Sequence, residues 1–184
     1  MEQSILITLN DVCTESTDEG LTCLCELLYN QQSASQRMWN FFQLITSSIM
    51  EDRGILDNYL DSSFAFIINM MNKESQNFKQ VSFPGANGQV DTALDMTLQL
   101  GQKAFEVAKE KGDEIWAINV VSLFNSLLEN ISGVSEVIPG ILSLLLNELS
   151  SAKTPEYKLM LLQGVLMCFW YDLGQSVGLL ESQG

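Results

Sequence analysis

Apolar residues recur at intervals of three and four positions along most of the chain, and no long stretch alternates with period two. This spacing is typical of amphipathic α-helices. It predicts a weak helix at the start, seven stronger helices and a short last turn. The predicted ranges are about 4–12, 17–28, 33–53, 55–71, 90–109, 113–128, 134–149 and 154–171, with the turn over 175–180.

Helix boundary signals support several of these ranges. Thr154-Pro155-Glu156 combines an N-cap residue with a proline suited to the first helical position. Lys109, Lys111 and Gly112 place cations and a glycine where the fifth helix should end. The polar stretch 72–89 contains the turn dipeptides Pro84-Gly85 and Asn87-Gly88, so we expect a long loop there.

The predicted helices fall into antiparallel pairs over about 35–72, 90–130 and 134–171. The pairs begin roughly forty to fifty residues apart, the length of a two-helix HEAT-type unit. We therefore expect an all-α fold, a HEAT-repeat-like right-handed α-solenoid that spans 1–184 as a single segment. A helical bundle fits the periodicity nearly as well. A solenoid should leave apolar faces exposed on its terminal helices.

Charge narrows the classes of function. The 184 residues include 9 Lys and Arg, 23 Asp and Glu and no histidine, which gives a net charge of −14 at pH 7. Such a chain is poorly suited to nucleic acids or anionic membranes, since it cannot neutralise phosphates. The lack of histidine removes the commonest general base and zinc ligand. We expect no enzyme activity, no cofactor, no metal, no nucleic-acid partner and no membrane partner.

The cysteines suggest a reducing compartment. Cys13, Cys23, Cys25 and Cys168 have neither the spacing of a disulfide framework nor that of a zinc ribbon, so we expect buried free thiols. The N-terminal residues carry no basic segment and only a short apolar run, unlike a signal peptide. The longest apolar stretch, 159–171, is too short to span a bilayer. We expect a soluble intracellular protein.

Several short sequences occur in an order that matches one family. They are Gln36-Arg37-Met38-Trp39, Tyr59-Leu60-Asp61, the run Ser135-Glu136-Val137-Ile138-Pro139-Gly140-Ile141-Leu142, and Lys153-Thr154-Pro155-Glu156-Tyr157-Lys158-Leu159 before an apolar helix ending in Phe169-Trp170-Tyr171. On these residues the chain from about Leu21 onward resembles the importin-beta (karyopherin) superfamily. The resemblance is closest to the importin-seven and importin-eight branch of nuclear transport receptors.

The resemblance implies a fragment from the later half of a nuclear import receptor. Such a receptor carries basic protein cargo through the nuclear pore, binds phenylalanine-glycine nucleoporins, and shuttles between cytoplasm and nucleus. A Ran-type GTPase controls the full-length receptor and binds mainly its N-terminal repeats, so the fragment should not switch by itself. The alternative is an armadillo-like or HEAT-type helical scaffold or adaptor subunit without a transport role.

Acidic residues supply the candidate binding surface. In HEAT stacks the second helix of each pair usually lines the concave face, and six acids lie on or beside those predicted helices. They are Asp57, Asp61, Asp113, Glu114, Glu129 and Glu156. Together they could attract basic cargo at low salt. The other interpretation is that these acids only keep an apolar chain soluble. The three tryptophans, Trp39, Trp116 and Trp170, are expected to pack in the core or, less simply, to line a groove for phenylalanine-glycine segments.

Overall fold

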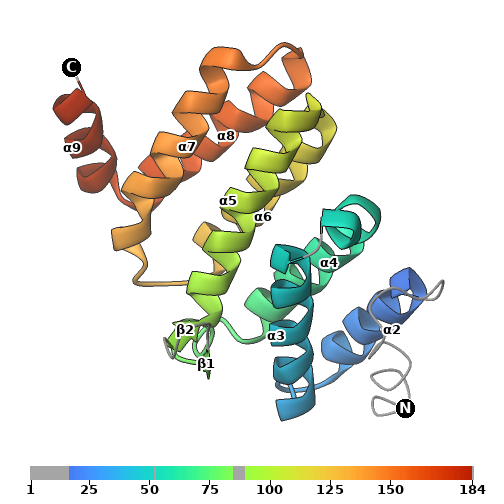
Figure 1. Cartoon of the computed structure of the whole chain (residues 1–184). Coiled ribbons are helices and arrows are strands. Elements are labelled where there is room, and N and C mark those ends of the chain that lie inside the picture. Colours follow the sequence, from blue (N-terminus) through green and yellow to red (C-terminus); the bar gives the residue numbers. More distant parts are fainter. Residues whose placement is uncertain (1–16, 52, 85–89, 184) are drawn as a thin grey trace. The chain divides into compact units, whose positions relative to one another are not determined.

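A computed structural model of the chain describes residues 17–51, 53–84 and 90–183, without the side chains of 17, 53–59 and 183 (Figure 1). In this part of the chain there are eight α-helices, one 3-10 turn and one two-stranded hairpin, which confirms the all-α class. The predicted helix over 4–12 lies outside the described residues. The helices are α2 Thr17–Asn30, α3 Gln36–Glu51, α4 Arg53–Lys73, α5 Ala93–Lys111, α6 Glu114–Asn130, α7 Ile138–Ser151, α8 Pro155–Tyr171 and α9 Leu173–Gln183.

The chain forms two compact units, residues 1–103 and 104–184, whereas the sequence analysis treats 1–184 as one segment. The boundary falls inside α5, between Lys103 and Ala104. The first unit holds α2 to α4 and the strands. The second unit holds the end of α5 and all of α6 to α9.

Helix α4 is the central element of the first unit, because α2 and α3 both pack against it. An aromatic cluster fills the core beside α3. The ring centroid of Phe42 lies 5.8 Å from that of Trp39, 5.6 Å from that of Phe78 and 5.9 Å from that of Phe83. These four aromatic side chains are buried. Of the three tryptophans, Trp39 therefore takes the core position that the sequence analysis expects.

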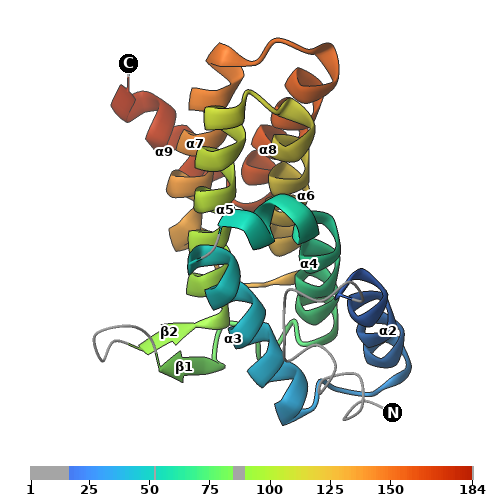
Figure 2. The same cartoon turned by 45° about the vertical axis from the view of Figure 1, so that its right-hand side comes forward.

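The long loop predicted over 72–89 needs correction in its later part. Ser82–Pro84 forms strand β1, which pairs antiparallel with β2, Val90–Thr92 (Figure 2). The fifth helix begins at Ala93 rather than Val90. Each strand is three residues long, too short for alternation to show in the sequence. Phe83 joins the aromatic cluster and so fixes the hairpin against the core.

Helix α8 is the central element of the second unit, because it packs against both α6 and α7, while α9 packs against α7 and α8 (Figure 1). The close approach depends on Gly164. A Cβ at this position would lie 2.9 Å from Cδ1 of Leu145 and 3.1 Å from Cγ1 of Val121. A larger side chain would therefore push α8 away from both neighbours.

The expected helix boundaries of this unit are found, with two differences. Thr154 caps α8, as the sequence signals predict, and Asp113 caps α6 at the predicted start of the sixth helix. The seventh helix is preceded by a 3-10 turn, Ser135–Val137, so α7 begins at Ile138 with a proline in its first turn. Helix α9 is longer than the predicted turn over 175–180.

One face of α8 is apolar and exposed. Leu159, Leu162, Leu166 and Trp170 follow one another at helical spacing, and Trp170 is 75% exposed. The apolar side chains of Leu173, Val177 and Leu180 on α9 are exposed too. Exposed apolar faces on the last helices were expected. The expectation that Trp170 lies in the core was wrong, because its helix is apolar on every side and only part of it is covered.

The cysteines differ in exposure. Cys168 is buried as predicted, and burial raises the pKa of its thiol to about 11. Cys23 is exposed and Cys25 half-buried, so the prediction of buried thiols fails for α2; Cys13 lies outside the described residues. No two of the three described cysteines form a disulfide. Among the described helices, none is both long enough and apolar enough to cross a membrane.

Candidate functional site

Three of the six predicted acids meet at one end of the second unit. Asp113, Glu114 and Glu156 line a single open cleft of about 740 Å³, together with Lys111 and Lys153. The cleft lies where the α5–α6 turn meets the loop between α7 and α8. This clustering brings together residues from two hairpins that are about forty positions apart in sequence.

The other predicted acids lie elsewhere. Glu129 is exposed near the far end of α6, which at 1.5 Å per residue is roughly 22 Å from Glu114. Asp61 is exposed on α4, in the first unit. Asp57 is also on α4, but its side chain lies outside the described residues. Of the four predicted acids in the second unit, three therefore lie together at the end of the hairpins beside two lysines, and Glu129 lies apart from them.

Asp113 has a local structural role. Gly112 adopts a positive φ of 68° just after α5, a conformation that glycine enters without strain. The chain then turns, and Oδ1 of Asp113 accepts a hydrogen bond of 3.1 Å from the backbone N–H of Trp116. The carboxylate thus caps α6 and is held at the edge of the cleft.

Glu114 joins the two hairpins. Its Oε1 accepts a hydrogen bond of 2.6 Å from the backbone N–H of Lys153, and its Oε2 accepts one of 2.8 Å from that of Thr154. Interaction with the Thr154 side chain, followed by the bond from the Lys153 N–H, lowers the pKa of Glu114. The charged carboxylate therefore fastens the α7–α8 loop to the start of α6.

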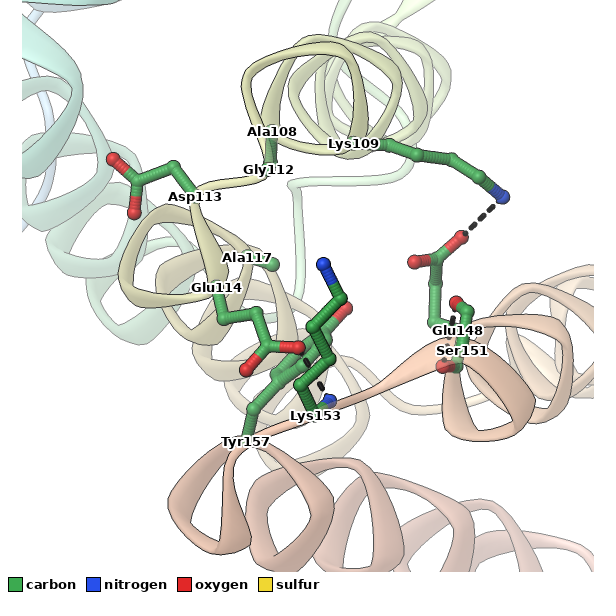
Figure 3. A pocket seen from close by; sticks show the side chains of 10 residues that line it. All are labelled: Ala108, Lys109, Gly112, Asp113, Glu114, Ala117, Glu148, Ser151, Lys153 and Tyr157. Atoms are coloured by element: carbon green, nitrogen blue, oxygen red, sulfur yellow. Dashed lines mark hydrogen bonds and ion pairs between the residues drawn. The ribbon is translucent and has the colours of Figure 1, made fainter.

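A smaller cavity of about 140 Å³ adjoins the cleft and shares Asp113, Glu114 and Lys153 with it (Figure 3). On one side, Nζ of Lys109 lies 3.2 Å from Oε1 of Glu148. The Lys109 side chain is 64% exposed and that of Glu148 only 15% exposed. An ion pair with one well-solvated partner contributes little to stability and can open readily.

Tyr157 extends from α8 toward the same cavity, and the Lys109–Glu148 pair lies to its right in Figure 3. Tyr157 is only 3% exposed, yet its hydroxyl makes no hydrogen bond to any described residue. Burial, next the negative charges of Glu148 and Glu114, and last an interaction of the hydroxyl with the Glu148 side chain raise the pKa of Tyr157. The hydroxyl is thus neutral in any physiological buffer and can both donate and accept a hydrogen bond.

At the opposite end of α8, a second tyrosine forms hydrogen bonds with the backbone of the α6–α7 connection. The hydroxyl of Tyr171 donates a hydrogen bond of 2.9 Å to the carbonyl oxygen of Ile131 and accepts one of 2.9 Å from the backbone N–H of Val134. These two bonds hold the α6–α7 connection. The hydroxyl of Tyr171 therefore has two hydrogen-bond partners, whereas the buried hydroxyl of Tyr157 forms no hydrogen bond of regular geometry and interacts only with Glu148.

Sequence reasoning missed Tyr157 and Glu148. Tyr157 falls at helical spacing with apolar residues of α8, which is typical of a core position. Only its N-terminal location, beside the Thr154 cap, could have indicated that it faces a turn. In the described residues, no group of three or more His, Cys, Asp or Glu side chains is placed to hold a metal ion. The cleft and the adjoining cavity instead offer carboxylates, amines and hydroxyls for binding a polar partner.

Comparison with known proteins adds no relative to this geometry: no protein-family model, curated protein or solved structure matches the chain.

Proposed function

We propose that the chain is a segment of a nuclear import receptor of the karyopherin type, which binds basic cargo and carries it through the nuclear pore under small-GTPase control. The observation that carries the proposal is the helix packing within each unit. Helix α2 packs on α4 in the first unit, and α6 packs on α8 in the second. Alternate helices that pack on one another are expected where helix pairs stack into a HEAT-like right-handed solenoid.

Charge supports basic cargo. The chain carries −14 at pH 7, and Asp113, Glu114 and Glu156 gather in one cleft of the second unit. A large net charge on the whole chain accelerates the approach of oppositely charged proteins, most strongly at low salt. Nucleoporins and the Ran-type GTPase would be partners of the full-length receptor, which would move between cytoplasm and nucleus.

The exposed apolar face of α8 is consistent with the stacking. In a solenoid each helix pair covers the apolar face of the previous one. Leu159, Leu166 and Trp170 offer such a face, and a further helix pair would cover it. The same face also favours the second candidate, a helical scaffold or adaptor subunit, because lasting subunit interfaces are more apolar than transient ones.

One binding experiment separates the two candidates. The chain is mixed with a histone or basic ribosomal protein, and separately with a phenylalanine-glycine peptide, at about 50 and about 200 mM salt. The carrier proposal expects cargo binding that weakens steeply with salt, together with binding of the peptide. Binding of neither ligand would contradict the carrier role and leave the scaffold role.

A further inference from the structure

The buried hydroxyl of Tyr157 interacts with the Glu148 side chain but forms no hydrogen bond of regular geometry. The side chain is 3% exposed, so the ring already fills its place in the core, but the hydroxyl makes no hydrogen bond there. Burying an unpaired hydroxyl costs free energy, and phenylalanine would fill the same space without that cost. A costly polar group that borders a cavity is expected where that group pairs with a ligand.

The surroundings of this hydroxyl favour a cationic ligand. Three carboxylates and two amines line the cavity. In the ion pair between them, the side chain of Glu148 is 15% exposed, whereas that of Lys109 is 64% exposed. Lys109 can therefore swing into solvent and give up its place to an incoming cation. The charge of −14 on the chain draws cations toward the same surface.

We propose that the cavity formed by Glu148, Tyr157 and Lys109 binds the guanidinium group of an arginine side chain from a protein partner. The guanidinium replaces the Lys109 amine at the Glu148 carboxylate and donates a second hydrogen bond to the Tyr157 hydroxyl. If the partner is the basic cargo proposed above, this inference rests on that function and identifies the side chain that the site selects.

The Glu148 carboxylate and the Tyr157 hydroxyl are two acceptors in one small cavity, an arrangement that suits arginine better than lysine. The guanidinium is a planar fork with five N–H donors, so one group can reach a carboxylate and a hydroxyl together. A lysine ammonium is a compact, strongly hydrated point charge and is already present as Lys109. A second copy of this chain is a poor occupant, because each copy carries −14. The site should therefore prefer arginine to lysine at equal net charge.

The test uses two short capped peptides of equal length, one of alternating arginine and glycine and one of alternating lysine and glycine. Their affinities for the whole chain are measured by fluorescence anisotropy at constant salt. For the unaltered chain we expect about tenfold tighter binding of the arginine peptide, the effect of one added hydrogen bond to a charged group. Tyr157→Phe should reduce this preference to about onefold without weakening the binding of the lysine peptide.

Glu148→Gln tests the carboxylate. It should weaken the binding of the arginine peptide by about tenfold or more, because the central ion pair is lost. Glu129→Gln is the matched control, since it removes the same charge from the exposed far end of α6. That control should change the affinity for both peptides equally and slightly. Equal affinity for the two peptides in the unaltered chain, or a preference that survives in Tyr157→Phe, would overturn the proposal.

The outcome separates this site from the carrier role. A chain that ignores histones but prefers the arginine peptide through Tyr157 retains the site and loses the carrier function. A chain that binds histones with the same affinity in Tyr157→Phe and Glu148→Gln retains the carrier function and loses the site.

Discussion

Each end of α8 contains a tyrosine, and the two tyrosines differ in the hydrogen bonding of their hydroxyl groups. Near its C-terminus, the hydroxyl of Tyr171 has two backbone partners at 2.9 Å and closes the α6–α7 connection. Near its N-terminus, Tyr157 is more deeply buried than Tyr171, yet its hydroxyl forms no hydrogen bond of regular geometry. The first end uses its polar group for stability. The N-terminal end retains a tyrosine hydroxyl without a regular hydrogen bond beside a cavity. For this reason we propose that a ligand binds at the N-terminal end of α8.

The two ends of α8 can be compared only if the helix is packed against α6 and α7 along its length. Gly164→Leu would disrupt that packing. The substitution places a large side chain where a Cβ alone would lie 2.9 Å from Leu145. We expect a loss of about 3 kcal/mol in the free energy of unfolding, since overpacking a core forces its neighbours apart. Urea denaturation followed by circular dichroism measures it. An unchanged midpoint would show that α8 is not tightly held between α6 and α7.

Tyr171→Phe tests the closed end. The variant leaves the carbonyl of Ile131 and the N–H of Val134 without their shared partner. We expect a loss of about 2 kcal/mol, because buried backbone groups that lose a hydrogen bond pay their desolvation cost. The same urea titration gives the value. A variant as stable as the unaltered chain would mean that water replaces the hydroxyl freely and that this end is not closed.

Acid should loosen both ends, because each has a carboxylate with a lowered pKa. The pKa of Glu114 is lowered chiefly by Thr154, and that of Asp172 chiefly by the backbone N–H of Gln175. A lowered folded-state pKa gives stability that is present above the ordinary carboxylate range and is lost as pH falls through the folded pKa. The advantage of the unaltered chain over Glu114→Gln should therefore shrink between about pH 5 and about pH 3. A constant difference across that range would exclude the charged clamp.

Local signals in the sequence predict the starts of helices well. Thr154 with Pro155 begins α8, and Asp113 caps α6, because capping depends on residues only a few positions apart. The short β1–β2 hairpin was missed because its strands are too short to alternate. The exposure of Trp170 was missed because an all-apolar helix does not show which of its faces is covered.

The sequence predicted the acids of the candidate site but not the other residues of the adjoining cavity. The acids were visible as charge, and three of them do meet at one cleft. That Glu114 is occupied with backbone N–H groups, and that Glu148 and Tyr157 border the adjoining cavity, depends on how two hairpins pack. Contacts between residues some forty positions apart leave no periodic trace in a single sequence.

The most direct test measures how far the arginine peptide stabilises the unaltered chain and Tyr157→Phe against urea. Without peptide, Tyr157→Phe should be at least as stable as the unaltered chain, because phenylalanine removes the cost of burying a hydroxyl that has no regular hydrogen bond. At a peptide concentration about a hundred times the dissociation constant, the unaltered chain should gain about 2.7 kcal/mol, and a tenfold weaker variant about 1.4 kcal/mol. Marked destabilisation of the variant without peptide, or an equal gain in both proteins, would contradict a ligand-binding role for Tyr157.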